Sequence, residues 1–366
     1  MEKATIAASL IAAAFGLGMF GSANADQATT QPEIPQSALQ ELVSTRLAAA
    51  NFSGVVLVAD NDKIILEQAH YSPSLTEGDV IEPNSRFAIA SMTKSFTTIL
   101  VLELAEQGLL SLDDTLKAHL ADYPADYAER ITIRQLLQNR SGIPHYVDLP
   151  GWFDTEYKQS LSLEGLVSAI ASLPLKFEPG SDYLYSSANC FLLGLIIEAV
   201  TGKSYEAVLS ETILTPLELN DTGQIYAEAI EPAVVQNFLQ EEDNAYVHIP
   251  IINPKLHRAT ASMYSTASDL FRWHQALWDD TLLSSDSQAE MFDRSGPMGW
   301  DVLAAPLENG ETLPIQTYNG EMAGYTSMIT RFPDRRGVVI ILNNNNSGYN
   351  TLAILTLDIA AKLYGQ

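Results

Sequence analysis

The sequence contains a single cysteine, Cys190, among its 366 residues. One cysteine cannot form a disulfide within the chain, so the folded state must depend on a hydrophobic core. Hydrophobic residues make up 46% of the sequence, which is enough to build such a core. The six histidines form no H-E-x-x-H motif, and there is no cysteine pair. We therefore expect neither a metal site nor a cofactor.

Basic residues are also scarce, with 20 Lys and Arg against 45 Asp and Glu and a formal net charge of −25. A field of this sign repels nucleic acids and anionic membrane surfaces. It favours neutral or cationic substrates, although an acidic, solvated surface suited to a salty exterior explains the same charge. We expect a small molecule or a peptide as the binding partner and no nucleic acid, and the oligomeric state stays open.

Long apolar segments are confined to the N-terminus. Lys3 precedes an apolar stretch over residues 4–21, and a small-x-small site follows at 23–25. This order predicts a signal peptide over residues 1–25 and export to the periplasm or the exterior. A membrane anchor is the alternative, but the stretch is rich in Ala and Gly and ends in a cleavage site. No later run reaches the ~18 apolar residues that a membrane span needs.

Strand patterns occur near both ends of the chain. The spacing of Leu39, Leu42, Val43 and Leu47 predicts a helix, and "SGVVLVADNDKIILEQAHY" predicts a hairpin. Near the C-terminus, "PIQTYNG" predicts a strand, "YTSMITRFPDRRGVVIILNN" a hairpin, and the last residues a helix. We expect one α+β domain over 26–366, with an antiparallel sheet flanked by helices from about 36–115 and 255–366. An inserted, mainly helical part would span about 116–254.

Ser91 and Lys94 form an S-x-x-K motif at the start of an apolar segment, "FTTILVLELAEQG". A helix that is apolar on every side is buried, so Ser91 would lie at the N-terminal end of a central helix, where developing negative charge is stabilised. Lys94 follows one turn later on the same face, and a lysine in an apolar setting can take a proton from serine. The alternative is a serine cap followed by a lysine on the helix surface.

Further motifs give this pair a context. Tyr185-Ser186-Ser187 precedes "LLGLIIEAVTGKSYE". A further stretch at 131–146 comes before this tyrosine, and two more, at 261–277 and 324–344, come after it. Together with S-x-x-K they resemble the superfamily of class C β-lactamases and penicillin-binding serine hydrolases. The resemblance covers nearly all of residues 50–345. It implies the β-lactamase/transpeptidase-like fold, with the active site in the crevice between the sheet and the helical part.

The resemblance also implies roles for individual residues. Ser91 matches the nucleophile of the family, Lys94 its lysine partner, and Tyr185 the tyrosine that exchanges protons with them. Tyr183 competes with Tyr185 for this role, but the spacing to Leu192-Leu193-Gly194 favours Tyr185. Which of Lys94 and Tyr185 is the base stays open, because such neighbours exchange protons as a coupled pair.

Two positions depart from the family pattern. Ser187 stands where the family often has Asn, and a hydroxyl lacks the simultaneous donor and acceptor groups of an amide. Tyr318 stands where the third motif usually has Lys or His, while Gly320 of that motif is kept. Ser187, Tyr318, Gly320 and Glu321 are the substrate-binding residues that the resemblance implies, with the oxyanion held by the backbone N–H groups of Ser91 and Glu321.

The predicted function is hydrolysis of an ester, an amide or a D-amino-acid peptide through an acyl-serine intermediate. A β-lactamase of low efficiency is one alternative. A non-catalytic protein that binds cell-wall peptides is another, because Ser187 and Tyr318 depart from the catalytic pattern.

Overall fold

The computed structural model describes residues 36–75, 78–225, 234–241, 245–307 and 310–365. The predicted signal peptide over residues 1–25 lies outside this part of the chain. Within it, no helix is both long and apolar enough to cross a membrane.

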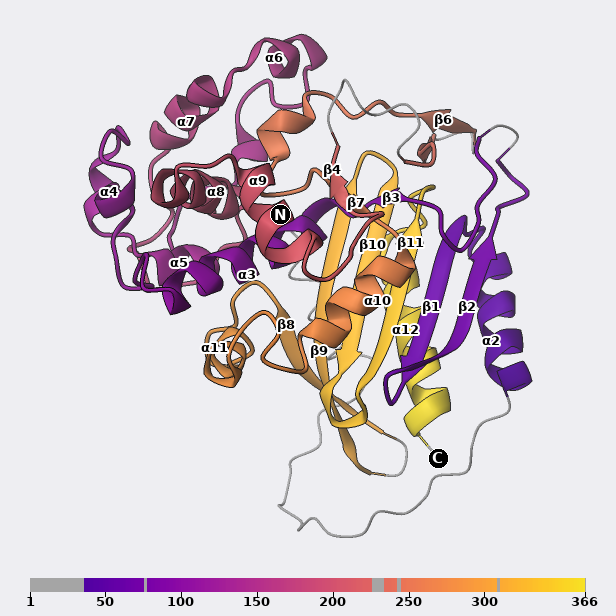
Figure 1. Ribbon diagram of the computed structural model, residues 1–366. Coiled ribbons are helices and arrows are strands. Elements are labelled where there is room, and N and C mark those ends of the chain that lie inside the picture. The colour runs from indigo at the N-terminus through magenta and orange to yellow at the C-terminus, as the bar shows by residue number, and fades with distance from the viewer. Residues whose placement is uncertain (1–35, 76–77, 226–233, 242–244, 308–309, 366) are drawn as a thin grey trace.

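A six-stranded antiparallel sheet forms the centre of the fold, in the order β2-β1-β11-β10-β9-β8 (Figure 1). Its strands come from both ends of the chain: β1 (Gly54–Asp60), β2 (Lys63–His70), β8 (Asp301–Pro306), β9 (Thr312–Met322), β10 (Tyr325–Phe332) and β11 (Gly337–Asn343). The N-terminal hairpin joins the C-terminal strands through β1 and β11, where Val55 lies opposite Leu342. The predicted hairpins and the C-terminal strands are therefore present.

The turn of the first hairpin consists of residue types that suit its backbone conformation. Asn61 and Asp62 connect β1 to β2 with φ angles of 49° and 59°. A two-residue hairpin turn with both central residues at positive φ matches the twist of the flanking strands, and Asn and Asp tolerate that conformation better than most residues.

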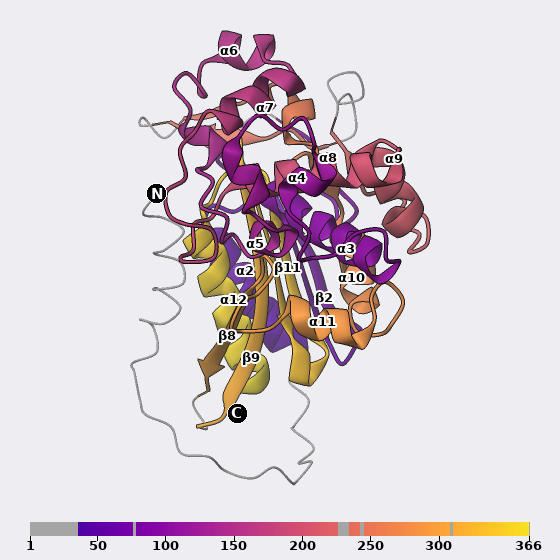
Figure 2. The same cartoon turned by 90° about the vertical axis from the view of Figure 1, so that its left-hand side faces the viewer.

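Helices cover both faces of the sheet (Figure 2). On one face, α2 (Gln36–Ala49) and α12 (Tyr349–Tyr364) bury residues such as Val43 and Ile359 against the strands. On the other face, α10 (Ala267–Ala276) packs through Leu270 and Trp273. Alternating strand residues supply the two cores, as the period of a half-buried antiparallel strand requires.

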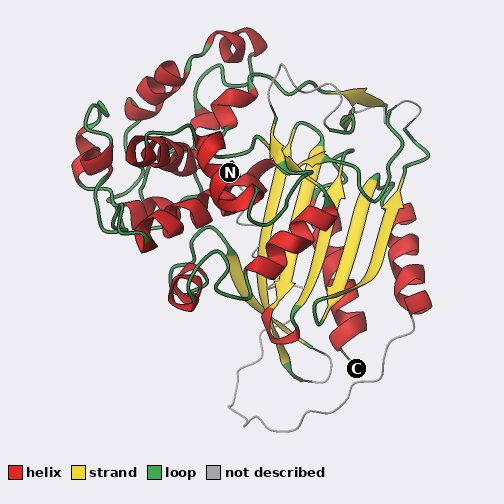
Figure 3. Ribbon diagram, viewed as in Figure 1, coloured by secondary structure: helices red, strands yellow, loops and turns green. Residues whose placement is uncertain are grey.

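Most of the remaining helices lie to one side of the sheet (Figure 3). They are α3 (Thr93–Glu106), α4 (Leu116–His119), α5 (Ile133–Leu137), α6 (Thr155–Ser160), α7 (Leu163–Ala171), α8 (Ser187–Thr201) and α9 (Tyr205–Leu209), while α11 (Ser285–Met291) lies near β8 and β9. The two apolar helices, α3 and α8, pack on each other in the interior of this group of helices. Short strands complete the fold: β3 (Phe87–Ala88), β4 (Gly223–Gln224), β5 (Phe238–Gln240), β6 (Tyr246–His248) and β7 (Met263–Ser265).

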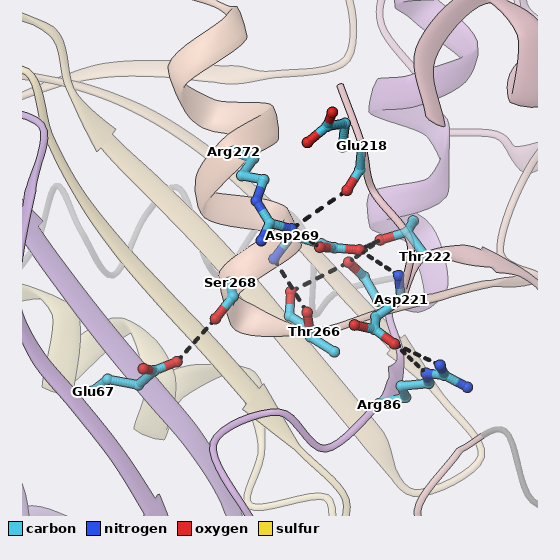
Figure 4. Close-up of polar contacts among 10 residues, drawn as sticks. Glu67, Arg86, Glu218, Asp221, Thr222, Thr266, Ser268, Asp269 and Arg272 are labelled. Atoms are coloured by element: carbon cyan, nitrogen blue, oxygen red, sulfur yellow. Dashed lines mark hydrogen bonds and ion pairs between the residues drawn. The ribbon is translucent and has the colours of Figure 1, made fainter. Parts of the chain in front are cut away.

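A buried carboxylate fastens α10 to the segment that leads out of the helical part (Figure 4). Asp269 is 1% exposed and accepts hydrogen bonds from the backbone N–H of Asp221 and the Thr222 hydroxyl, both at 2.8 Å. Arg272 donates to its second oxygen at 2.6 Å, and Arg86 pairs with Asp221. Removing the partners of a buried charge strongly destabilises a fold, so these hydrogen bonds hold α10 against the segment that contains Asp221 and Thr222.

Candidate active site

Ser91 lies in a strained turn between β3 and α3. The preceding residue, Ala90, has a φ of 47°, a conformation that costs a non-glycine residue about 1–3 kcal/mol. Ile89 holds the turn from both sides, because its N–H donates to Met263 O at 2.9 Å and its carbonyl accepts from Ser327 Oγ at 2.7 Å. The strain is thus maintained by two flanking strands, and it sets Ser91 at the N-terminal end of α3.

Lys94 is buried one turn further along, with an exposure of 2%. Its Nζ lies 2.9 Å from Ser91 Oγ and donates to the carbonyl oxygen of Thr260 at 2.8 Å. The alternative of a lysine on the helix surface is therefore wrong. A buried amine needs such partners, and here they are the serine and one carbonyl.

Tyr185 completes the group. Its hydroxyl lies 2.9 Å from Ser91 Oγ, and Lys94 Nζ lies 5.4 Å from the centre of its ring. The competing candidate, Tyr183, is 61% exposed. Ser186 caps α8 by accepting from the N–H of Ala188, which fixes the backbone directly after Tyr185. Three side chains from two buried helix ends thus meet at one oxygen.

Strand β9 passes close to the serine. A Cβ atom on Gly320 would lie 2.2 Å from Ile89 O and 2.8 Å from Ser91 N, so only glycine fits there. Glu321 follows directly with its side chain exposed. The backbone of the third motif therefore lies against the backbone of the serine turn.

Tyr318 lies two residues before Gly320 on the same strand and is 5% exposed. Its ring meets Trp300 edge-on at 5.4 Å, and its hydroxyl lies 3.2 Å from where a Cβ of Gly299 would be. Burial, followed by the nearby Tyr185, raises the pKa of Tyr318 well above its usual value. The position where the family usually has a cation holds a neutral phenol.

Ser187 faces a histidine that the sequence did not single out. Its Oγ lies 3.4 Å from His145 Nε2, a long contact, and the His145 ring meets the Tyr185 ring edge-on at 5.7 Å. Burial, with smaller effects of Lys94 and His257, lowers the pKa of His145 to about 3. The imidazole is therefore neutral at physiological pH and can donate and accept one hydrogen bond each.

A second polar group behind Lys94 was also missed. The Tyr146 hydroxyl lies 3.0 Å from Thr260 Oγ1 and 3.2 Å from His257 Nδ1. Burial, then the charges of Lys158 and Lys94, lowers the pKa of His257 to about 3. The only sequence signal for Tyr146 was its place at the end of a stretch that resembles the family.

Comparison with known proteins identifies the family. A model of the Beta-lactamase family matches residues 39–361. The chain belongs to this family. Penicillin-binding protein 4* of Bacillus subtilis (strain 168) is 28% identical over 336 residues, covering 84% of this chain and 71% of that protein. Protein flp of Staphylococcus aureus (strain NCTC 8325 / PS 47) is 25% identical over 324 residues, and the match spans 86% of this chain but less than two thirds, 64%, of that protein.

A solved structure supports the same fold. The crystal structure of a D-stereospecific amidohydrolase from Streptomyces sp. superposes with a TM-score of 0.73 at 22% identity, covering 91% of this chain and all of that one. The predicted family resemblance and the predicted α+β fold class are both confirmed. The chain therefore shares its fold with a protein described as an amidohydrolase.

Proposed function

We propose that this protein is a serine hydrolase that forms an acyl-serine intermediate, with Ser91 as nucleophile and Lys94 and Tyr185 as proton-transfer groups. The observation that carries the proposal is the pair of 2.9 Å contacts at Ser91 Oγ, one to each partner. Serine becomes a good nucleophile only when a neighbouring group takes its proton, and both partners stand within reach. The proton goes to whichever of them has a free lone pair, the amine of Lys94 or the phenolate of Tyr185.

The reaction would proceed in two steps. Ser91 Oγ adds to the carbonyl carbon of the substrate while its proton passes to Lys94 or Tyr185, and the carbonyl oxygen becomes an anion facing the N–H groups of Ser91 and Glu321. The C–O or C–N bond then breaks, and the leaving alcohol or amine takes that proton. In the second step water adds to the acyl-serine ester, gives a proton to the same groups, and releases the acid as Ser91 regains its own proton.

We propose an uncharged or cationic ester, amide or D-amino-acid peptide as the substrate. The neutral phenol of Tyr318 offers a carboxylate one hydrogen bond in place of a positive charge, and the net charge of −25 acts in the same direction. The D-stereospecific amidohydrolase of the same fold is consistent with an amide or peptide. The signal-like pattern of residues 1–25 supports action in the periplasm or outside the cell.

One alternative, a non-catalytic binder of cell-wall peptides, keeps some support from the departures at Ser187 and Tyr318. Another is a β-lactamase of low efficiency. Both would use the same crevice, so the alternatives differ in whether and how fast the acyl group leaves Ser91.

The test combines ester turnover with intact mass. The parent protein is expected to hydrolyse a p-nitrophenyl ester, and Ser91→Ala is expected to reduce the rate by more than ~10²-fold without loss of fold. Ser168→Ala, on the exposed face of α7, is the matched control.

Exposure to a fluorescent penicillin then separates the alternatives. A stable adduct on Ser91 indicates slow deacylation, whereas release of hydrolysed penicillin indicates a β-lactamase, and the turnover rate gives its efficiency. No ester turnover and no adduct would overturn the hydrolase proposal in favour of the binder.

A further inference from the structure

The carbonyl that accepts a hydrogen bond from Lys94 belongs to a segment that is bound to α3. Lys94 Nζ donates to Thr260 O at 2.8 Å, and one turn further Thr97 Oγ1 donates to the preceding carbonyl, Ala259 O, at 2.7 Å. The N–H of Met263 donates to Thr93 Oγ1 at 3.2 Å. Residues 259–263 thus lie along one face of α3, held by three of its side chains.

Three residues, Tyr146, His257 and Thr260, hold the other side of this segment through linked hydrogen bonds. Thr260 Oγ1 donates to His257 O at 3.1 Å, so its single proton is used and it can only accept from the Tyr146 hydroxyl at 3.0 Å. The Tyr146 oxygen is then free to accept from His257 Nδ1 at 3.2 Å. This assignment requires a neutral His257 with its proton on Nδ1, which agrees with its depressed pKa of about 3.

Tyr146 and Thr260 are buried, His257 is partly buried, and none of the three touches Ser91. Tyr146 is 1% exposed and Thr260 0%, and the Tyr146 ring packs on Trp152 at 4.8 Å and on Phe191 at 6.3 Å. The ring is therefore held by packing that does not need its hydroxyl. Removing the hydroxyl would leave the ring in place and remove the hydrogen bonds to Thr260 and His257, together with a hydroxyl contact to Ser187.

We propose that Tyr146, His257 and the Thr260 side chain are positioning residues that aim the Thr260 carbonyl at Lys94 and so hold the amine against Ser91. The inference rests on the proposed function, in which Lys94 handles the serine proton. Proton transfer is sensitive to displacements well below 1 Å, because the partners must stay within hydrogen-bond reach. None of the three residues is assigned a contact with substrate, so their loss should affect kcat rather than KM.

The experiment compares variants that lose a hydroxyl group with a variant that loses a methyl group instead. Tyr146→Phe and Thr260→Val remove one hydroxyl each and keep the shape, and each is expected to lower kcat for a p-nitrophenyl ester about tenfold, with KM changed less than twofold. Thr260→Ser keeps the hydroxyl and loses the methyl group, and it should restore kcat to within threefold of the parent. Thr356→Val is the matched control, because it removes a buried hydroxyl from α12 on the opposite face of the sheet.

A second readout does not depend on turnover. In protein labelled with ¹³C-lysine, the Lys94 side-chain signal, assigned by its loss in Lys94→Ala, should shift in Tyr146→Phe and Thr260→Val but not in Thr260→Ser or Thr356→Val. If the parent has no esterase activity, the proposed function fails while this spectrum still tests the positioning role.

Three outcomes would overturn the inference. The first is an unmoved Lys94 signal together with unchanged kcat in the two hydroxyl-deleted variants. The second is a Thr260→Ser variant that loses as much kcat as Thr260→Val, which would assign the role to packing. The third is a change confined to KM, which would place the group in substrate binding.

Discussion

Substitution of Gly320 by alanine probes the closest approach between β9 and the serine turn. The added Cβ would lie 2.2 Å from Ile89 O and 2.8 Å from both Ser91 N and Ser327 Oγ. Ordinary contacts between non-bonded heavy atoms begin near ~3.5 Å, so the two backbones must separate by about 1 Å. Neither side can yield easily, since the 2.7 Å bond from Ser327 to Ile89 O holds the same turn.

This separation sets the expected loss of activity and of stability in Gly320→Ala. Loss of one oxyanion donor costs about 10²–10³-fold in kcat, and a 1 Å misplacement of reacting groups costs about 10²-fold. We therefore expect Gly320→Ala to lower kcat/KM for a p-nitrophenyl ester by about 10²–10³-fold. Overpacking should also reduce the free energy of unfolding by about 1–3 kcal/mol, seen as a lower Tm.

The control is Gly337→Ala at the far end of the β10–β11 hairpin. Its added Cβ would meet the Tyr364 hydroxyl at 2.4 Å, so it should lower Tm without lowering kcat/KM. Equal loss of activity in both variants would attribute the effect to instability. A Gly320→Ala protein within threefold of the parent in kcat/KM would show that this close approach does not shape the oxyanion site.

Three further outcomes are expected. Tyr318→Lys should raise kcat/KM for penicillins by roughly 10- to 150-fold and leave a neutral ester nearly unchanged, and equal effects on both substrates at matched ionic strength would refute the reasoning. Cys190, 7% exposed and with its pKa raised to about 11 by burial, should resist iodoacetamide in the native protein, and fast labelling without denaturant would contradict this. The Tm should fall as the pH is lowered from about 6.5 toward 3. In this range the unfolded chain binds protons at His145 and His257, whereas the folded protein does not, because both pKa values are about 3 in the folded state. His257→Gln should flatten that slope, and a slope equal to that of the parent would count against a neutral His257 in the folded protein.

The sequence predicts those parts of the fold that depend on patterns among residues close together in the chain. The hairpin around Asn61 and Asp62 and the alternating strands near the C-terminus follow from period and turn chemistry alone. Ser91 and Lys94 are one turn apart, so their common face also follows from helix geometry. The family resemblance supplied Tyr185, whose approach to Ser91 spans 94 residues of sequence and obeys no local rule.

The residues that were missed depend on contacts between distant segments. Thr260 lies 166 residues from Lys94, and its side chain carries no sign that its carbonyl accepts the amine. Tyr146 and His257 are 111 residues apart, and each alone reads as an ordinary core or loop residue. Local patterns therefore predict Ser91 and Lys94, whereas the residues behind them emerge only once the segments are packed together.

The pairing of β1 with β11 has a consequence for how the protein acquires its structure. Val55 and Leu342 are neighbours in the sheet but lie at opposite ends of the chain, and closing a loop of that length costs on the order of 5 kcal/mol of chain entropy. Contacts of such large sequence separation slow folding, because the entropy is lost before the strand pairing compensates for it. In β10, Ser327 lies 238 residues after Ile89, the residue whose carbonyl it fastens beside Ser91. A ribosome-bound or truncated chain that lacks β10 and β11 should therefore be unable to assemble the candidate active site, so any activity would appear only after both strands have been made.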